Sequence, residues 1–496
     1  MNIKEAKEEI CRTVTAYQAR TEAGLYRIPS EKKRPILLIG APGIGKTAIV
    51  EQAAAECGIG FLSYTMTHHT RQSAVGLPLL KEKTFQGKAC TVTEYTMSEI
   101  IGRVMELMEE GGQEEGILFL DEINCVSETL MPAMLQFLQF KTFGCHRLPE
   151  GWIIVAAGNP PRYNRSAREF DVVTLDRVKY MELEASFDSW KEYALSRNLH
   201  SAILSYLTMK PEQLYVFRRT ETGKEFVTPR GWEDLSQILE TYEDLGLPVE
   251  DALFSQYLQC RETALDFFSY YRLSRRLLAS PVLETLTRDG TLPEDAPSSS
   301  EWSGLSFDER LCVTEHLLHS IRRQVRSYEN RRQLIQSLSY FAEGLAAQHP
   351  DFSGLEQVCA GLLAKRKASL QKRKEFGLLD RREEERERLL ADTVRQYASR
   401  VRLSHFSDTR NEPAPDSAVS AMTSLIRADM DELEQDALRL ERVLRGTSEF
   451  IDTRFGDSPE AFLFFTELTE QEDTSRFLSV RMGDLKDRIL QMTARD

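Results

Sequence analysis

The sequence lacks three features that would place the protein in a membrane or outside the cell. No apolar run approaches the roughly 18 residues that a membrane-spanning helix needs. The N-terminal stretch MNIKEAKEEI lacks the basic and apolar regions of a signal peptide. The eight cysteines include no C-x-x-C pair, which argues against both a disulfide framework and a zinc site. We therefore expect a cytoplasmic protein with no membrane span and with reduced thiols.

Basic residues are also scarce relative to acidic ones. Lys and Arg number 63 against 77 Asp and Glu, which leaves a formal net charge of −14 at pH 7. Nonspecific attraction to nucleic acid or to an anionic membrane depends on basic surface, so this balance argues against both partners. With 496 residues the chain is long enough for about three domains, each with its own core.

A phosphate-binding loop stands near the N-terminus. Four apolar residues, Ile36 to Ile39, predict a strand buried on both faces, and the sequence GAPGIGKT follows directly. This sequence satisfies the pattern G-x-x-x-x-G-K-[ST], whose glycines let successive backbone N–H groups face a polyphosphate. The residues expected to contact ATP are Gly40, Ala41, Pro42, Gly43, Ile44, Gly45, Lys46, Thr47 and Ala48.

Two side chains of this loop have separate expected roles. Lys46 is expected to reach the β- and γ-phosphates, and the Thr47 hydroxyl is expected to bind Mg²⁺. The following residues, AIVEQAAAEC, predict a helix whose positive N-terminal end faces the phosphates.

A second apolar strand ends in two acidic residues. Ile117–Asn124 reads ILFLDEIN, so Asp121 and Glu122 follow the strand at the edge of the sheet where ligands bind in open α/β folds. Asp121 is the expected partner of Mg²⁺ or its water shell. Glu122 is the expected general base that deprotonates the attacking water. Alone the pattern is weak, because such acids often cap a helix, but it lies downstream of a phosphate loop.

Three further polar positions follow predicted structural elements. Asn159 comes after the strand Trp152–Ala157, where its amide could bond both the γ-phosphate and the lytic water. Arg177 stands immediately before the strand Lys179–Leu183. Arg230 lies in the first turn of a helix that Thr228 caps.

Taken in order, these motifs resemble those of AAA+ ATPases, and most closely the MoxR-like branch. The matching segments are GAPGIGKT, LFLDEIN, AAGNPP, LDRV and VTPR, and the resemblance covers roughly residues 30–280. The resemblance implies an α/β fold: an αβα sandwich with a parallel sheet and a phosphate loop, a helical lid domain and an all-α C-terminal domain. It further implies that Asn159 is sensor 1, that Arg177 is an arginine finger acting on a neighbouring subunit, and that Arg230 is sensor 2.

The same resemblance implies partners. MoxR-like ATPases form rings, usually of six subunits, with ATP at the subunit boundaries, and commonly work with a protein that carries a von Willebrand factor type A domain. The favoured interpretation is therefore an ATP-driven remodeller or chaperone of a partner protein. Two alternatives stay open at this point: a nucleic-acid motor, and a nucleotide-gated scaffold with slow hydrolysis.

The chain departs from the family where an aromatic pore residue is expected. The segment Ser73–Pro78 offers only Val75 and Leu77, so Phe85 and Phe143, each in a predicted hairpin, are the aromatic alternatives. His68 and His69 are interpreted as loop or core residues rather than metal ligands. The pair His316 and His319 lacks the H-E-x-x-H order, which excludes a metalloprotease of that kind.

The remaining pattern predicts the other elements and the domain borders. We expect strand Phe61–Thr67, loop His68–Leu80, hairpin Lys83–Tyr95, helix Met97–Glu110, helix Glu128–Phe140 and hairpin Lys141–Gly151. Residues 186–279 read as helical. The expected domains are a nucleotide-binding domain (1–185), a lid (186–288), a linker (289–302) and a C-terminal helical domain (303–496) that could bind a partner or form a coiled coil.

Overall fold

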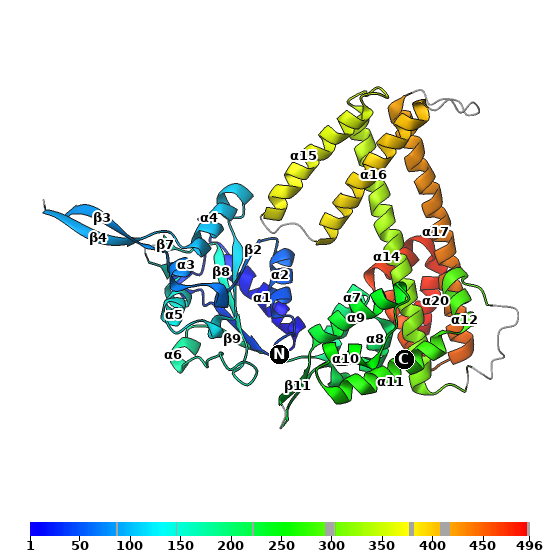
Figure 1. Ribbon diagram of the computed structural model, residues 1–496, viewed down its shortest axis with the longest axis horizontal. Coiled ribbons are helices and arrows are strands. Elements are labelled where there is room, and N and C mark those ends of the chain that lie inside the picture. The colour runs from blue at the N-terminus through cyan, green and yellow to red at the C-terminus, as the bar shows by residue number, and fades with distance from the viewer. Residues whose placement is uncertain are drawn as a thin grey trace. The chain divides into compact units, whose positions relative to one another are not determined.

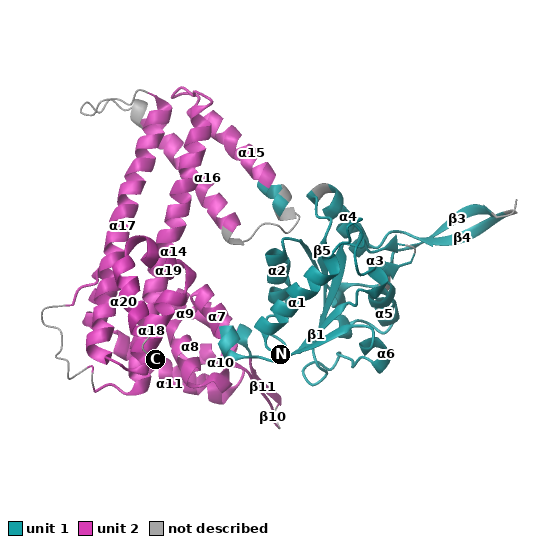
Figure 2. Cartoon of the chain, turned by 180° about the vertical axis from the view of Figure 1, so that it is seen from behind, with its two compact units in different colours: residues 1–190, 228–230, 370–379 teal, residues 191–227, 231–369, 380–496 magenta. Residues whose placement is uncertain are grey.

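The computed structural model describes residues 1–85, 88–144, 146–220, 223–292, 302, 304–375, 381–406 and 417–493. The chain divides into two compact units (Figure 2). The first contains residues 1–190, 228–230 and 370–379, and the second contains residues 191–227, 231–369 and 380–496. Residues of the expected lid and of the expected C-terminal domain thus share the second unit.

A five-stranded parallel sheet forms the centre of the first unit (Figure 1). Its strand order is β2-β5-β8-β1-β9. The strands are β1 (Ile36–Gly40), β2 (Gly60–Thr65), β5 (Gly116–Asp121), β8 (Trp152–Gly158) and β9 (Lys179–Leu183). The apolar runs of β1 and β8 are buried throughout, as expected for parallel strands covered on both faces.

Helices cover both faces of this sheet, so the expected αβα sandwich is confirmed. The helices are α1 (Ile3–Gln18), α2 (Lys46–Cys57), α4 (Glu99–Gly111) and α5 (Met131–Phe140), with the short α6 (Val172–Leu175) before β9. One face packs α4 and α5 against Leu118 and Leu120 of β5. Helix α5 begins three residues later than expected, with Pro132 in its first turn, where a missing N–H costs nothing.

The prediction of a loop over His68–Leu80 is wrong. Met66–His68 form a 3-10 turn, and Arg71–Val75 form helix α3, which starts at a capping box between Thr70 and Ser73. Strand β3 then begins at Pro78. The hairpin β3 (Pro78–Phe85) and β4 (Lys88–Tyr95) is therefore longer than predicted and extends away from the sheet (Figure 1). The expected turn at residues 86–87 lies outside the described residues. The second hairpin is present as β6 (Thr142–Phe143) and β7 (His146–Arg147).

Among its described residues, the second unit consists of helices joined by loops, with one hairpin. The expectation of a purely helical segment over residues 186–279 is therefore wrong, because β10 (Val216–Thr220) pairs with β11 (Gly223–Val227). The helices up to the expected linker are α7 (Phe187–Arg197), α8 (Ser201–Met209), α9 (Pro229–Asp244), α10 (Asp251–Tyr257), α11 (Arg261–Leu278) and α12 (Pro281–Asp289). Most of the expected linker, residues 293–300, lies outside the described residues.

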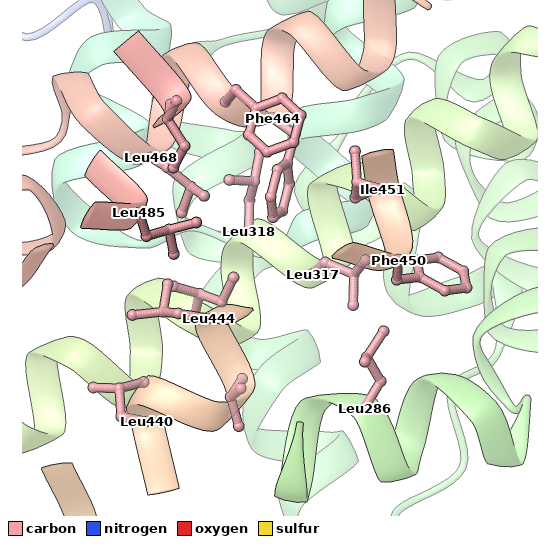
Figure 3. Packing of buried hydrophobic residues seen from close by; sticks show 14 of the residues in the cluster. Leu286, Leu317, Leu318, Leu440, Leu444, Phe450, Ile451, Phe464, Leu468 and Leu485 are labelled. Atoms are coloured by element: carbon pink, nitrogen blue, oxygen red, sulfur yellow. The ribbon is translucent and has the colours of Figure 1, made fainter. Parts of the chain in front are cut away.

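Two long antiparallel helices, α14 and α17, organise the rest of this unit. The helices are α14 (Phe307–Ala346), α15 (Leu355–Glu375), α16 (Arg381–Phe406), α17 (Ala418–Phe455), α18 (Pro459–Glu470), α19 (Glu472–Arg481) and α20 (Gly483–Thr493). One apolar core joins α12, α14, α17 and α18, with Leu317, Leu444 and Phe464 fully buried (Figure 3). A second core lies where α14 and α17 meet α15 and α16.

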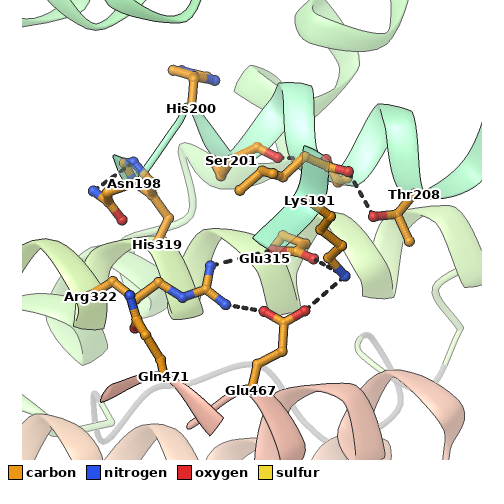
Figure 4. Close-up of polar contacts among 12 residues, drawn as sticks. Lys191, Asn198, His200, Ser201, Thr208, Glu315, His319, Arg322, Glu467 and Gln471 are labelled. Carbon is orange, nitrogen blue, oxygen red and sulfur yellow. Dashed lines mark hydrogen bonds and ion pairs between the residues drawn. The ribbon is translucent and has the colours of Figure 1, made fainter. Parts of the chain in front are cut away.

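A buried group of four charged side chains lies within the second unit (Figure 4). Lys191 of α7 pairs with Glu467 of α18 at 2.8 Å, and Glu467 also pairs with Arg322 of α14. Glu315, about two helical turns before Arg322 and fully buried, faces Lys191 at 3.8 Å and Arg322 at 3.9 Å. Burial and the adjacent Glu467 carboxylate raise the pKa of Glu315. This charge group ties α7 to α14 and α18.

Candidate active site

The phosphate loop leaves β1 at the carboxyl edge of the sheet and enters α2. Gly43 and Gly45 have φ angles of 75° and 94°, in the left-handed region that favours glycine, so these two glycines make the turn possible. Ile44 is buried with its side chain against Gly40, whereas Pro42, Thr47 and Ala48 are exposed. The loop ends at the N-terminus of α2, where unpaired backbone N–H groups and the helix dipole favour an anion.

Lys46 lies almost completely inside this loop, with 8% of its surface exposed. Its Nζ donates to the carbonyl oxygens of Gly40 at 3.0 Å and Ala41 at 2.8 Å, and to Oδ1 of Asn159 at 2.8 Å. Burial lowers the pKa of Lys46 to about 8, against the opposing effect of Asp121. The structure thus brings the lysine of the loop and the amide of the neighbouring strand into direct contact.

Thr47 and Asp121 also meet, at the same edge of the sheet. The Thr47 hydroxyl donates to Oδ2 of Asp121 at 3.1 Å. Hydroxyl and carboxylate oxygens are the ligands that Mg²⁺ prefers, so these two residues fit a magnesium ion that also binds phosphate oxygens. Such an ion, when bound, would neutralise charge on the phosphates.

Glu122 is held in an unusual backbone conformation. Its φ angle is 55°, which is uncommon for a residue with a side chain, and its backbone N–H donates to Oδ1 of Asp121 at 2.8 Å. The Thr67 hydroxyl donates to Oε2 of Glu122 at 2.9 Å. Strain of this kind persists where surrounding contacts over-determine the backbone, as at functional sites. Thr67 was not among the residues expected at the site.

The two arginines lie in different places. The Cβ of Arg230 is 3.5 Å from the position a Cβ would take on Gly43, so Arg230 flanks the phosphate loop of its own chain. Arg177 follows α6 and precedes β9, and it contacts Gln139 at the end of α5. Both arginines are exposed. The structure therefore brings Arg230 to the loop together with Asn159 and Asp121, and leaves Arg177 apart.

The strand register places Arg177 at the amino ends of the strands, opposite the carboxyl ends where the phosphate loop lies. Ile36 of β1 pairs with Lys179 of β9, and Gly40 pairs with Leu183, in parallel. The phosphate loop follows Gly40, whereas Arg177 precedes Lys179. At about 3.3 Å per strand residue, the two are separated by roughly 13 Å or more along the strands. Arg177 thus lies beyond the amino ends of β1 and β9.

The expectation that Phe143 could serve as a pore aromatic is wrong. Phe143 is 2% exposed and stacks on Phe137 with a ring separation of 3.9 Å. The side chain of Phe85, the other aromatic alternative, lies outside what the structure describes. His69 contacts the Ser73 hydroxyl at 3.3 Å and the edge of Tyr64. The described residues contain no cluster of three or more potential metal ligands of the His, Cys, Asp or Glu type.

Among the described residues, no helix is both long enough and apolar enough to cross a membrane.

The sequence pattern did not identify Thr67 or Asn124, which the structure places at the site, nor Gln139, which contacts Arg177 away from it. Asn124 follows the two acids in a 3-10 turn, Ile123–Cys125, and is 2% exposed. An asparagine two positions after Glu122 was its only signal in the sequence, and that signal alone assigns no partner.

A comparison with protein families agrees with a phosphate-loop site. Residues 36–172 match the family AAA, the ATPases associated with various cellular activities. This part of the chain is therefore an AAA ATPase domain, and the protein is an ATP-hydrolysing phosphate-loop enzyme. No curated protein sequence matches the chain. Among solved structures it is similar to a mutant of the RuvB protein of Thermotoga maritima, with 13% identity, 57% of this chain and 78% of that chain covered, and a TM-score of 0.30.

Proposed function

We propose that the protein is a MoxR-like AAA+ ATPase whose subunits form a ring, in the manner of a hexamer, and hydrolyse ATP with Mg²⁺ at the subunit boundaries. In this proposal hydrolysis drives the remodelling or maturation of a partner protein in the cytoplasm. The resemblance of the five motifs suggests a partner with a von Willebrand factor type A domain. The net charge of −14 weighs against nucleic acid as the substrate.

The position of Arg177 supports this proposal most strongly. Its own phosphate loop lies at the other edge of the sheet, so Arg177 has no catalytic use within its own chain. An exposed arginine at that edge can instead face the γ-phosphate bound to a neighbour. An arginine supplied in this way can raise the rate by roughly 10³–10⁵. Lys46, Thr47, Asp121, Glu122, Asn159 and Arg230 then act within one chain, and Arg177 acts across the boundary.

A protein partner fits the surface of the β3–β4 hairpin. Leu80 is 72% exposed on it, and Leu77 and Leu79 beside it are also exposed. Apolar surface of this kind is commonly used to contact other proteins. The hairpin belongs to the same unit as the ATP site, so we propose it as the part that touches the partner.

The size of the protein with and without nucleotide tests the ring. The Glu122→Gln variant would be measured by light scattering at micromolar concentration, in the absence and presence of ATP with Mg²⁺, because it is expected to bind ATP without consuming it. We expect a mass several times that of one chain when ATP is present. A single-chain mass in both conditions would contradict a finger that acts between subunits.

A further inference from the structure

Asn124 lies at the junction of three segments that are far apart in the sequence. It belongs to the 3-10 turn after β5, two residues beyond Glu122. Within the first unit it packs under Gly158, the last residue of β8, and beside the segment that contains Arg168. Its side chain is an amide that is 98% buried, so both of its polar groups need partners inside the protein.

The amide nitrogen of Asn124 has two such partners. Nδ2 donates to the backbone oxygen of Asn159 at 2.8 Å and to that of Arg168 at 3.2 Å. The backbone oxygen of Asn124 in turn accepts from the N–H of Arg168 at 3.0 Å. Oδ1 has only the weak donor Sγ of Cys125, at 3.8 Å. Asn124 is therefore the side chain that holds the backbone of Asn159, whose own amide contacts Lys46.

The space around Asn124 is closed. A Cβ on Gly158 would stand 2.5 Å from Oδ1 of Asn124, closer than Cβ contacts come in proteins. Gly158 directly precedes Asn159, so the absence of a side chain there lets Asn124 approach the end of β8. A longer side chain at position 124 would displace the same backbone. The close contact between Gly158 and the Asn124 side chain therefore limits which residues fit at both positions.

We propose that Asn124 is a positioning residue for hydrolysis, and that it acts by fixing the backbone of Asn159 so that the Asn159 amide faces the γ-phosphate site. This rests on the proposed role of Asn159 as sensor 1. Asn124 touches neither the phosphate loop nor the predicted magnesium ligands in any contact that the structure records. Its loss should therefore slow the chemical step and leave nucleotide affinity nearly unchanged.

The isosteric substitution Asn124→Asp provides the sharpest test. It keeps the shape that fits under Gly158 and replaces the two N–H donors by an acceptor that repels the carbonyl oxygens of Asn159 and Arg168. We expect kcat to fall by about tenfold or more, with the dissociation constant for ATP changed by less than about threefold. Affinity would be measured by calorimetry in the Glu122→Gln background. Asn124→Ala, which removes the donors without adding charge, should lower kcat in the same direction.

A matched control comes from the same region. Asn164 donates to Sγ of Cys125 at 3.3 Å, next to Asn124, and makes no recorded contact with Asn159. Asn164→Ala should leave kcat within about twofold of the unchanged protein. Melting temperatures of all variants would show which of them remain folded. The proposal would be overturned if kcat fell in proportion to the melting temperature in every variant, Asn164→Ala included.

The double variant Asn124→Ala with Asn159→Ala separates the two assignments. If Asn124 acts through Asn159, kcat of the double variant should equal that of Asn159→Ala alone. If the fold-losses of kcat from the two substitutions multiply, the positioning role of Asn124 is wrong, while the role of Asn159 stands. The same conclusion follows if Asn159→Ala is slow and Asn124→Asp hydrolyses ATP at the normal rate. If Asn159→Ala hydrolyses ATP at the normal rate, the sensor role itself is wrong and the positioning role falls with it.

Discussion

The Thr67 hydroxyl donates a 2.9 Å hydrogen bond to the carboxylate of Glu122, the expected general base. This bond occupies one of the oxygens that would otherwise accept a proton from water. The pair therefore restrains the base in the state that the structure describes.

Removing this restraint should raise the rate of hydrolysis. We expect Thr67→Ala to increase basal ATP turnover by about three- to tenfold, because the Glu122 carboxylate gains a free acceptor site. Thr67→Ser keeps the hydroxyl and should stay near the normal rate. Steady-state phosphate release measures both. A fall in turnover to the level of Glu122→Gln would mean that Thr67 aligns the base instead of restraining it.

Lys46 and Glu122 should separate binding from chemistry. Lys46→Ala removes the cation expected on the β- and γ-phosphates, so ATP affinity should fall by about tenfold or more. Glu122→Gln keeps the shape of the base and loses its basicity, so it should bind ATP normally and hydrolyse it at least about a hundredfold more slowly. Calorimetry and phosphate release distinguish the two. Equal loss of binding in both variants would contradict the assignment of Glu122 as the base.

The central strands and the residues at their ends could be predicted because their signal is local. Apolar runs identify β1, β5 and β8, and the polar residues that follow each run meet at one edge of a parallel sheet. Helix α3 was missed because its apolar content is low, although the capping pair Thr70 and Ser73 marks its start. The β10–β11 hairpin was missed because short strands between helical segments carry little periodicity.

The contacts of Thr67 and Asn124 could not be predicted for a different reason. They depend on strand order, which no single segment of sequence reveals. Thr67 reaches Glu122 because β2 pairs with β5 in the register Thr65 to Asp121. Asn124 reaches Asn159 because β5 lies beside β8. Both partners are more than thirty residues away along the chain.

The buried charge group of the second unit should be sensitive to the loss of one charge. Glu467→Gln leaves Lys191 and Arg322 facing only Glu315 inside the protein. An uncompensated buried charge costs about 3–5 kcal/mol, so the melting temperature should fall by several degrees. Glu472→Gln removes a partner of Arg476 on the surface and should cost less than about 1 kcal/mol. Equal melting temperatures for the two variants would show that the buried group does not hold α7, α14 and α18 together.

His316 predicts how stability depends on pH. Burial, together with the neighbouring His319 and His200, lowers the pKa of His316 to about 4 from its ordinary value of 6.5. Between these two values the unfolded chain binds a proton that the folded chain does not, so stability falls as pH drops from about 6.5. We expect His316→Leu to lose less melting temperature between pH 7 and pH 5 than the unchanged protein. The difference corresponds to at most about 2 kcal/mol. The same loss in both proteins would contradict a buried neutral histidine.

Mixed rings should tell the two arginines apart. Arg177→Ala subunits keep an intact phosphate loop, and Lys46→Ala subunits keep an intact Arg177. If Arg177 acts across a subunit boundary, mixing the two inactive variants restores hydrolysis at every interface where an intact loop meets an intact finger. The activity of the mixture should then exceed the sum of its separate components by severalfold, as phosphate release would show.

Arg230 should behave in the opposite way, because it flanks Gly43 of its own phosphate loop. In a mixture of Arg230→Ala and Lys46→Ala subunits, every site lacks either the lysine or the arginine, so no recovery is expected. Light scattering with ATP and Mg²⁺ would verify that mixed assemblies form. Recovery in this second mixture would place Arg230 at a neighbour's site. If mixed assemblies form but the mixture of Arg177→Ala and Lys46→Ala shows no recovery, Arg177 has no role in catalysis, because the length of the strands separates it from the phosphate loop of its own chain.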